Sequence, residues 1–100
     1  MSIPATDSTL ERNVASGNGG HGFLLERALR SHLEANRSHA NGLDGIRSAL
    51  TSTANTFLEN VMFENAEHDA HDDNRPANTW TGNRCLTDFP TGTICENESP

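Results

Sequence analysis

A run of alternating acidic and imidazole side chains between Glu64 and Asp73 is the part of the sequence best suited to chemistry. If this run is helical, Glu64 and His68 share one face of the helix, and so do Glu67 and His71. Imidazole and carboxylate groups brought together at such spacings can chelate Zn²⁺ or a similar divalent ion. The candidate metal ligands are Glu64, Glu67, His68, His71 and Asp72.

The same run also fits a simpler interpretation, in which the helix frays near Ala66 and the acids form a solvated tail. Carboxylates near the C-terminal end of a helix oppose the helix dipole. A bound cation would relieve that conflict, so the metal hypothesis predicts a gain of helicity when Zn²⁺ is added. We expect no cofactor apart from a divalent metal ion under this alternative.

The two cysteines, Cys85 and Cys95, flank the turn-forming sequence Phe89-Pro90-Thr91-Gly92. A β-hairpin centred on Pro90 would place the cysteines opposite each other, where a disulfide could form. In the chain-entropy description, closing a loop of this size stabilises the fold by roughly 3 kcal/mol. The alternative is a pair of reduced thiols in a cytosolic protein. The spacing is not the Cys-x-x-Cys of a redox enzyme or a zinc site.

Two segments in the middle of the sequence, residues 23–40 and 43–67, carry apolar residues at helical spacing. Asn41-Gly42 between them is typical of a helix end. Two helices joined by so short a connection usually pack antiparallel. The pattern therefore predicts a helical hairpin over residues 23–67, and one long helix through Gly42 is the alternative.

The second of these segments has the stronger apolar pattern, with steps of three and four residues that form a seam for another helix. Trp80 is the only tryptophan and lies in a polar stretch, where it could cover the helices or anchor a partner. The predicted contact face consists of Leu43, Ile46, Leu50, Ala54, Phe57, Val61 and Trp80.

The remaining segments predict little regular structure. Residues 1–22 are rich in glycine and indicate a flexible N-terminal arm. Residues 68–79 form an acidic linker with Pro76 as a breaker, and residues 80–100 form a small cysteine-containing β-hairpin and tail. With 33% hydrophobic and 5% aromatic residues, the chain has a small core for its length. The expected fold is mainly α and partly disordered.

One family resemblance accompanies this pattern. In residues 43–66, Leu43-x-x-Ile46, the stretch Thr53-Ala54-x-x-Phe57 and the triplet Glu64-Asn65-Ala66 resemble the second helix of small WXG100-type proteins. The resemblance implies a helical hairpin that is exported by type VII secretion without a signal peptide. It covers about a quarter of the chain. The Trp-Thr-Gly triplet at residues 80–82 follows the predicted helices instead of joining them.

The net charge of the chain indicates which class of partner it could bind. The formal net charge is −7, and residues 64–100 hold eight acids against two arginines. Such a surface disfavours direct nucleic-acid binding and favours a basic protein partner. No phosphate loop or catalytic triad is recognisable, so we expect a non-enzymatic protein that binds a protein partner or itself. The alternatives are a metal-binding or metal-sensing module, and an exported or virus-encoded factor, WXG100-like or an acidic inhibitor.

Location is left open by the sequence. The first residues lack the basic and apolar regions of a secretory signal peptide. No apolar run is long enough to predict a membrane span. We expect a soluble protein, either cytoplasmic or exported by a non-classical route.

Overall fold

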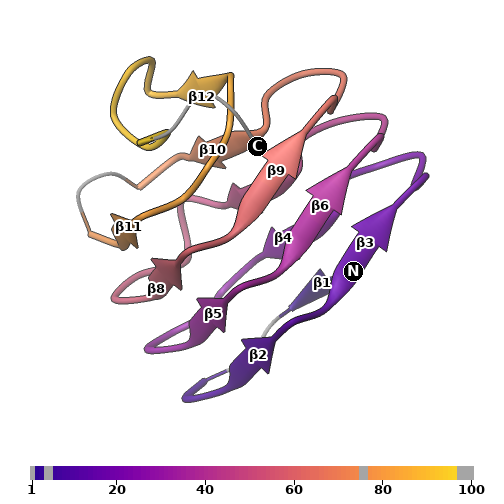
Figure 1. The fold of residues 1–100 in the computed structure, drawn as a ribbon. Helices are drawn as coiled ribbons and strands as arrows, with labels where there is room; N and C mark the ends of the chain where they lie inside the picture. Colours follow the sequence, from indigo (N-terminus) through magenta and orange to yellow (C-terminus); the bar gives the residue numbers. More distant parts are fainter. Residues whose placement is uncertain (1, 4–5, 75–76, 97–100) are drawn as a thin grey trace.

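The computed structural model describes residues 2–3, 6–74 and 77–96, and all its regular elements are β-strands. The strands form three parallel sheets along which the chain winds as a β-solenoid (Figure 1). Hydrogen-bonded neighbours on adjacent turns are commonly 23 or 24 residues apart. Every strand pair is parallel, so one turn lies directly above the next.

The strands are short and fall into three rows. The first sheet contains β1 (Ser2–Ile3), β4 (Phe23–Leu25), β7 (Ile46–Ser48), β10 (Ala70–Asp72) and β12 (Asp88–Phe89). The second sheet contains β2 (Thr9–Glu11), β5 (His32–Glu34), β8 (Thr56–Leu58) and β11 (Thr79–Thr81). The third sheet contains β3 (Val14–Ser16), β6 (Arg37–His39) and β9 (Val61–Phe63).

The chain turns from one sheet to the next at corners that contain a residue with positive φ. Ala35 has a φ of 57° and Glu59 a φ of 52°, and each directly precedes a buried asparagine. These asparagines, Asn36 and Asn60, stack in a column, because the Nδ2 of Asn36 donates to the Oδ1 of Asn60 at 3.0 Å. The Nδ2 of Asn60 donates in turn to the Oδ1 of Asn83 at 3.0 Å.

This column, which we call the asparagine ladder (Asn13, Asn36, Asn60 and Asn83), satisfies buried polar groups turn by turn. A buried polar group is tolerated when it has hydrogen-bond partners. Apolar side chains fill the rest of the interior: Leu33 lies in register with Phe57, whose ring stacks on Trp80 at 3.9 Å between centroids. Stacked polar columns allow a chain of modest apolar content to form a continuous interior.

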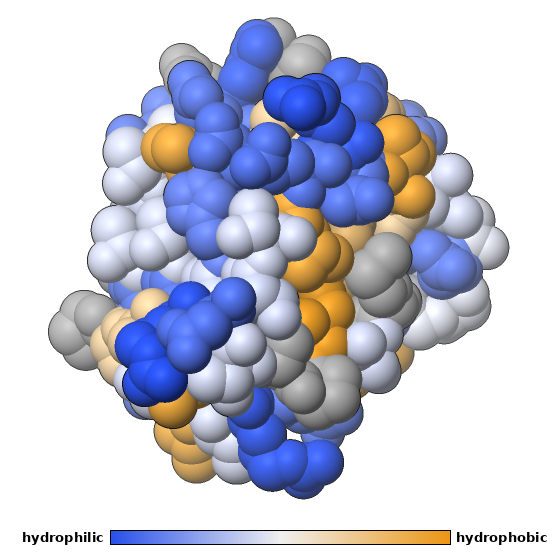
Figure 2. Space-filling view, turned by 90° about the horizontal axis from the view of Figure 1, so that it is seen from below, coloured by the Kyte–Doolittle hydropathy of each residue, from blue (hydrophilic) through white to orange (hydrophobic). Residues whose placement is uncertain are grey.

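The surface of the molecule is consistent with the modest apolar content of the sequence. In the view from below Figure 1, hydrophilic and intermediate residues cover most of the molecule, and apolar residues show in a central band and in smaller patches near the edges (Figure 2). Four large apolar side chains are conspicuously exposed among the described residues: Val14, Leu50, Leu86 and Phe89.

The predicted helical hairpin over residues 23–67 is wrong. That range holds β4 to β9, and within each of these strands inward and outward residues alternate with a period of two. At each corner the alternation of inward and outward residues starts again. Across several short strands, the spacing of apolar residues then resembles the three- and four-residue spacing of a helix. The resemblance to WXG100-type helical proteins was misleading for the same reason.

The predicted contact face is divided among several elements. Ile46 is buried in the first sheet and Phe57 and Trp80 in the second, whereas Leu50 is 70% exposed at a turn. Leu43 and Val61 are half-buried, and Ala54 lies exposed at a corner. The seam therefore does not exist as one surface, and the binding of a protein partner stays a prediction.

The other expected segments also differ from the structure. The arm predicted to be flexible contains β1, β2 and β3, and the acidic linker contains β10. Residues 80–96 form no hairpin, because β12 pairs in parallel with β10. Of the two alternatives left open for the cysteines, the structure contains the disulfide: Cys85 and Cys95 are bonded. Pro76 and the tail at 97–100 lie outside the described residues.

Candidate metal centre

Three consecutive turns of the solenoid place His21, Asp44 and His68 side by side, just before the strands of the first sheet. The main-chain N–H of Gly22 donates to the carbonyl of Asp44, and that of Gly45 donates to the carbonyl of His68. These bonds fix the three segments in register. His71 follows one strand position after Ala70 in β10 and lies beside Arg47 of β7.

Asp44, His68 and His71, which we call the metal triad, each direct one ligand atom into a common space. The Nδ1 of His68 lies 3.4 Å from the Oδ1 of Asp44, and the Nδ1 of His71 lies 3.4 Å from the Oδ2. One ligand atom from each residue falls within 4.8 Å of the other two. Zn²⁺ and similar ions hold such ligands at about 2.0–2.2 Å, which places donor atoms a few ångströms apart.

The donor atoms of the metal triad lack hydrogen-bond partners. The Asp44 side chain is fully buried, and its Oδ2 receives no hydrogen bond; nor do the buried Nδ1 atoms of His68 and His71 form one. Leaving a buried polar atom unsatisfied costs about 1–3 kcal/mol. A cation between these three atoms would satisfy all of them together.

The far side of the His71 ring is held by a carboxylate. The Nε2 of His71 lies 2.7 Å from the Oδ1 of Asp73, so Nε2 carries the proton and donates to the carboxylate. The lone pair of Nδ1 then faces Asp44. Carboxylates orient metal-binding imidazoles in this way and fix the tautomer that binds metal.

Asp73 is held in turn by Arg47, whose guanidinium nitrogen lies 2.6 Å from the Oδ2. Burial acts to raise the pKa of Asp73, but the hydrogen bonds from Arg47 and His71 outweigh it, and the pKa falls below its ordinary value. Asp73 therefore stays ionised and remains an acceptor for His71.

His21 completes the surroundings of Asp44. Its Nδ1 accepts a hydrogen bond of 3.1 Å from the main-chain N–H of Asp44, so this nitrogen carries no proton. The same nitrogen is only 3.2 Å from the Oδ2 of Asp44. Two electron-rich atoms thus face each other without a proton between them. Burial is the largest influence on His21 and lowers its pKa, which keeps the ring neutral.

The predicted ligands divide into two groups. His68 and His71 belong to the metal triad, and the exposed Glu67 lies beside His68 on the wall of a neighbouring pocket. Glu64 is exposed at a corner with a φ of 56°. Asp72 points the other way into the interior, where its carboxylate accepts a hydrogen bond of 2.8 Å from the Trp80 indole.

Sequence reasoning missed the carboxylate of the metal triad, Asp44, and the supporting residues Asp73, Arg47 and His21. A signal for them was present, because His21, Asp44 and His68 recur at the repeat of the solenoid. The short motif Leu-Glu-x-Asn at 10–13 and 33–36 and its shortened form Leu-Glu-Asn at 58–60 end in asparagines that are 23 and 24 residues apart. Repeats of 20–50 residues are typical of solenoids.

A parallel β-solenoid with a cluster of two half-buried imidazoles and one buried carboxylate is the class of protein that the fold and site define. Residues 1–93 match the family described as periplasmic copper-binding protein (NosD), and the chain belongs to this family. Comparisons with curated proteins and with solved structures gave no match.

The family description bears on location and on the metal. It names the periplasm, which suggests an exported protein, and the non-classical route stays a prediction. Through the described part of the chain, no helix has the length and apolar character needed to cross a membrane. The description also names a metal, in agreement with the metal alternative in its general form.

Proposed function

We propose that this chain binds a copper ion, as Cu²⁺, at the metal triad. The observation that carries the proposal is the convergence of three buried or half-buried donor atoms without hydrogen-bond partners. The carboxylate of Asp73 supports it, because it leaves the Nδ1 of His71 free to act as a ligand. The family description supports the identity of the metal.

The donor set fits Cu²⁺ better than Cu⁺. Imidazole nitrogen suits Cu²⁺ and Zn²⁺, whereas Cu⁺ prefers thiolate and thioether sulfur. Both cysteines are consumed by the disulfide, and Met62 is fully buried within β9. Among divalent ions, Cu²⁺ binds a given site of nitrogen and oxygen ligands most tightly. Zn²⁺ is the natural competitor.

Binding at the metal triad joins two turns of the solenoid. Asp44 lies on the turn that contains β7, whereas His68 and His71 lie on the next turn, which contains β10. A cation there would neutralise the buried carboxylate and add a link between these turns. The folded state would gain stability from the bound ion in proportion to the logarithm of its concentration above the Kd.

Calorimetric titration of the full chain with Cu²⁺, and separately with Zn²⁺, tests the proposal. We expect one ion per chain, tighter binding of Cu²⁺, and a copper electron paramagnetic resonance spectrum with nitrogen coupling. His71→Ala should abolish this binding. The matched control is His32→Ala, since His32 lies outward on β5, where its Nε2 pairs with Glu34.

Two results would contradict the proposal. One is a wild-type chain that binds no Cu²⁺ although circular dichroism shows the β-rich fold. The other is equal binding by His71→Ala and His32→Ala, which would assign the metal to scattered surface groups.

A further inference from the structure

The segment between the two cysteines, residues 85–95, which we call the disulfide loop, forms one side of the surroundings of the metal triad. Its strand β12 pairs with β10 and places Phe89 in register with His71. The Phe89 ring centroid lies 4.9 Å from that of His71 and 5.9 Å from that of His68. Phe89 therefore covers both imidazoles of the triad.

The disulfide loop also builds most of a pocket beside His68. This pocket has a volume of about 320 Å³. Its lining residues are Glu67, His68, Leu86, Thr87, Asp88 and Thr91, and four of these six belong to the loop. His68 is the most exposed member of the triad, with 35% of its side chain accessible, so the loop borders the route between solvent and the site.

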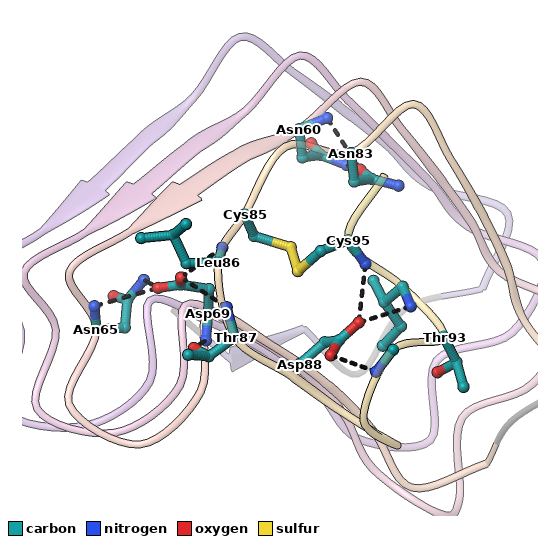
Figure 3. Close-up of a disulfide and its surroundings, with 12 residues drawn as sticks. Asn60, Asn65, Asp69, Asn83, Cys85, Leu86, Thr87, Asp88, Thr93 and Cys95 are labelled. Carbon is teal, nitrogen blue, oxygen red and sulfur yellow. Dashed lines mark hydrogen bonds between the residues drawn. A yellow bond between two sulfur atoms is a disulfide. The ribbon is translucent and has the colours of Figure 1, made fainter. Parts of the chain in front are cut away.

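Besides the disulfide, the buried Ile94 side chain, the hydrogen bond from the N–H of Glu96 to the carbonyl of Asn83, and the carboxylate of Asp88 hold the far end of this loop. The Asp88 carboxylate accepts hydrogen bonds from the main-chain N–H groups of Gly92, Ile94 and Cys95 at 2.8–2.9 Å (Figure 3). The strand itself has only two residues, Asp88 and Phe89. A strand pair of this length has little stability of its own. The Cys85–Cys95 bond is the only covalent tie that closes the loop.

We propose that the Cys85–Cys95 disulfide controls how tightly the metal triad retains its ion, and that reduction of this bond releases the metal. The proposal rests on the metal-binding function argued above. A dithiol reductant supplies two electrons and two protons, the S–S bond breaks, two thiols form, and the reductant becomes a cyclic disulfide. The opened loop then withdraws Phe89 from the imidazoles and exposes the site to water, which weakens metal binding.

The test compares three forms of the full chain under identical, reductant-free conditions. The first is the oxidised wild type. The second is wild type that has been reduced with dithiothreitol, alkylated with iodoacetamide and desalted. The third is the Cys85→Ser/Cys95→Ser double variant. Each is titrated with Zn²⁺, which is redox-inert, in competition with a chromophoric chelator, and dissociation is timed after addition of excess chelator.

We expect the second and third forms to bind Zn²⁺ about tenfold more weakly, and to release it faster, than the oxidised wild type. Phe89→Ala with the disulfide intact should reproduce most of this change, and it keeps the proposal testable if the serine variant does not fold. Leu86→Ala is the matched control, because Leu86 belongs to the same loop and is 57% exposed.

The outcomes separate the two proposals. Equal affinity and equal dissociation rates in all forms, with Phe89→Ala unchanged, would overturn the redox control and leave the metal site standing. No Zn²⁺ or Cu²⁺ binding by the oxidised wild type would instead overturn the metal site itself.

Discussion

The asparagine ladder and the metal triad are both buried polar columns that cross successive turns, but they differ in how their polar atoms are satisfied. In the ladder, the Oδ1 of Asn60 accepts from both the main-chain N–H and the Nδ2 of Asn36. In the triad, the Oδ2 of Asp44 and the Nδ1 atoms of His68 and His71 form no hydrogen bonds. Identical residues on successive turns complete one another, whereas the mixed column leaves room for a ligand.

The comparison predicts opposite effects of removing a side chain from each column. Asn60→Ala should lower the free energy of unfolding by about 3 kcal/mol, because groups on both neighbouring turns lose hydrogen bonds to the asparagine side chain. On the preceding turn the main-chain N–H of Asn36 loses its acceptor, and on the following turn the Oδ1 of Asn83 keeps only the main-chain N–H of residue 60. Urea unfolding followed by Trp80 fluorescence measures the change. A loss below about 1 kcal/mol would show that water replaces the ladder.

Asp44→Asn should not lower the free energy of unfolding of the metal-free protein. The substitution removes a buried negative charge whose Oδ2 has no hydrogen-bond partner and only a long ion pair of 3.9 Å with Arg47, and the new amide oxygen can still accept from the N–H of His68. We expect unchanged stability or a gain of up to about 1 kcal/mol, together with loss of most Cu²⁺ affinity. Urea unfolding and calorimetry report the two effects. A loss of stability as large as that of Asn60→Ala would make Asp44 a structural residue.

Asp73→Asn tests whether Asp73, which contacts the Nε2 of His71, supports metal binding by the triad. An amide cannot stabilise the His71 tautomer as well as a carboxylate, and it loses the ion pair with Arg47. Metal affinity should fall by about tenfold while the stoichiometry stays at one. Asp7→Asn is the control, since the Asp7–Arg30 ion pair lies exposed elsewhere on the solenoid. Unchanged affinity in Asp73→Asn would remove Asp73 from the site.

The smallest expected effect concerns pH. The pKa of His21 is lower in the folded protein than its ordinary value of 6.5, chiefly because of burial. The unfolded chain therefore binds the proton first, and stability that is present above pH 6.5 declines as the pH falls toward the folded pKa. Neighbouring charges on Asp44, Arg47 and Glu67 act on the same ring.

The measurement is the difference in Tm of the metal-free protein between pH 7.5 and pH 5.5. It should be smaller in His21→Gln than in wild type, because glutamine does not titrate. Asp73 contributes little in this window, since its lowered pKa places its loss of stability at more acidic pH. An unchanged difference in the variant would assign the pH dependence to other groups.

The sequence contained part of this picture. It indicated the disulfide, because Cys85 and Cys95 flank a turn, and it nominated His68 and His71 as metal ligands. It did not reveal Asp44, which is 24 residues before His68 and approaches it only because each turn lies above the last. Helical spacing was a poor guide because non-glycine residues such as Ala35 and Glu59 adopt positive φ at the corners. That conformation is unusual for residues of this kind, so no propensity scale indicates it.

Those corners also store strain that could be removed. Among the described residues, the non-glycine residues with positive φ include Ala35, Ala40 and Ala54, which have φ values of 57°, 55° and 60°. The left-handed conformation costs roughly 1–2 kcal/mol for a residue with a Cβ atom and nothing comparable for glycine. The solenoid thus operates below the stability its own backbone permits, and its corners are the natural sites for thermostabilising redesign.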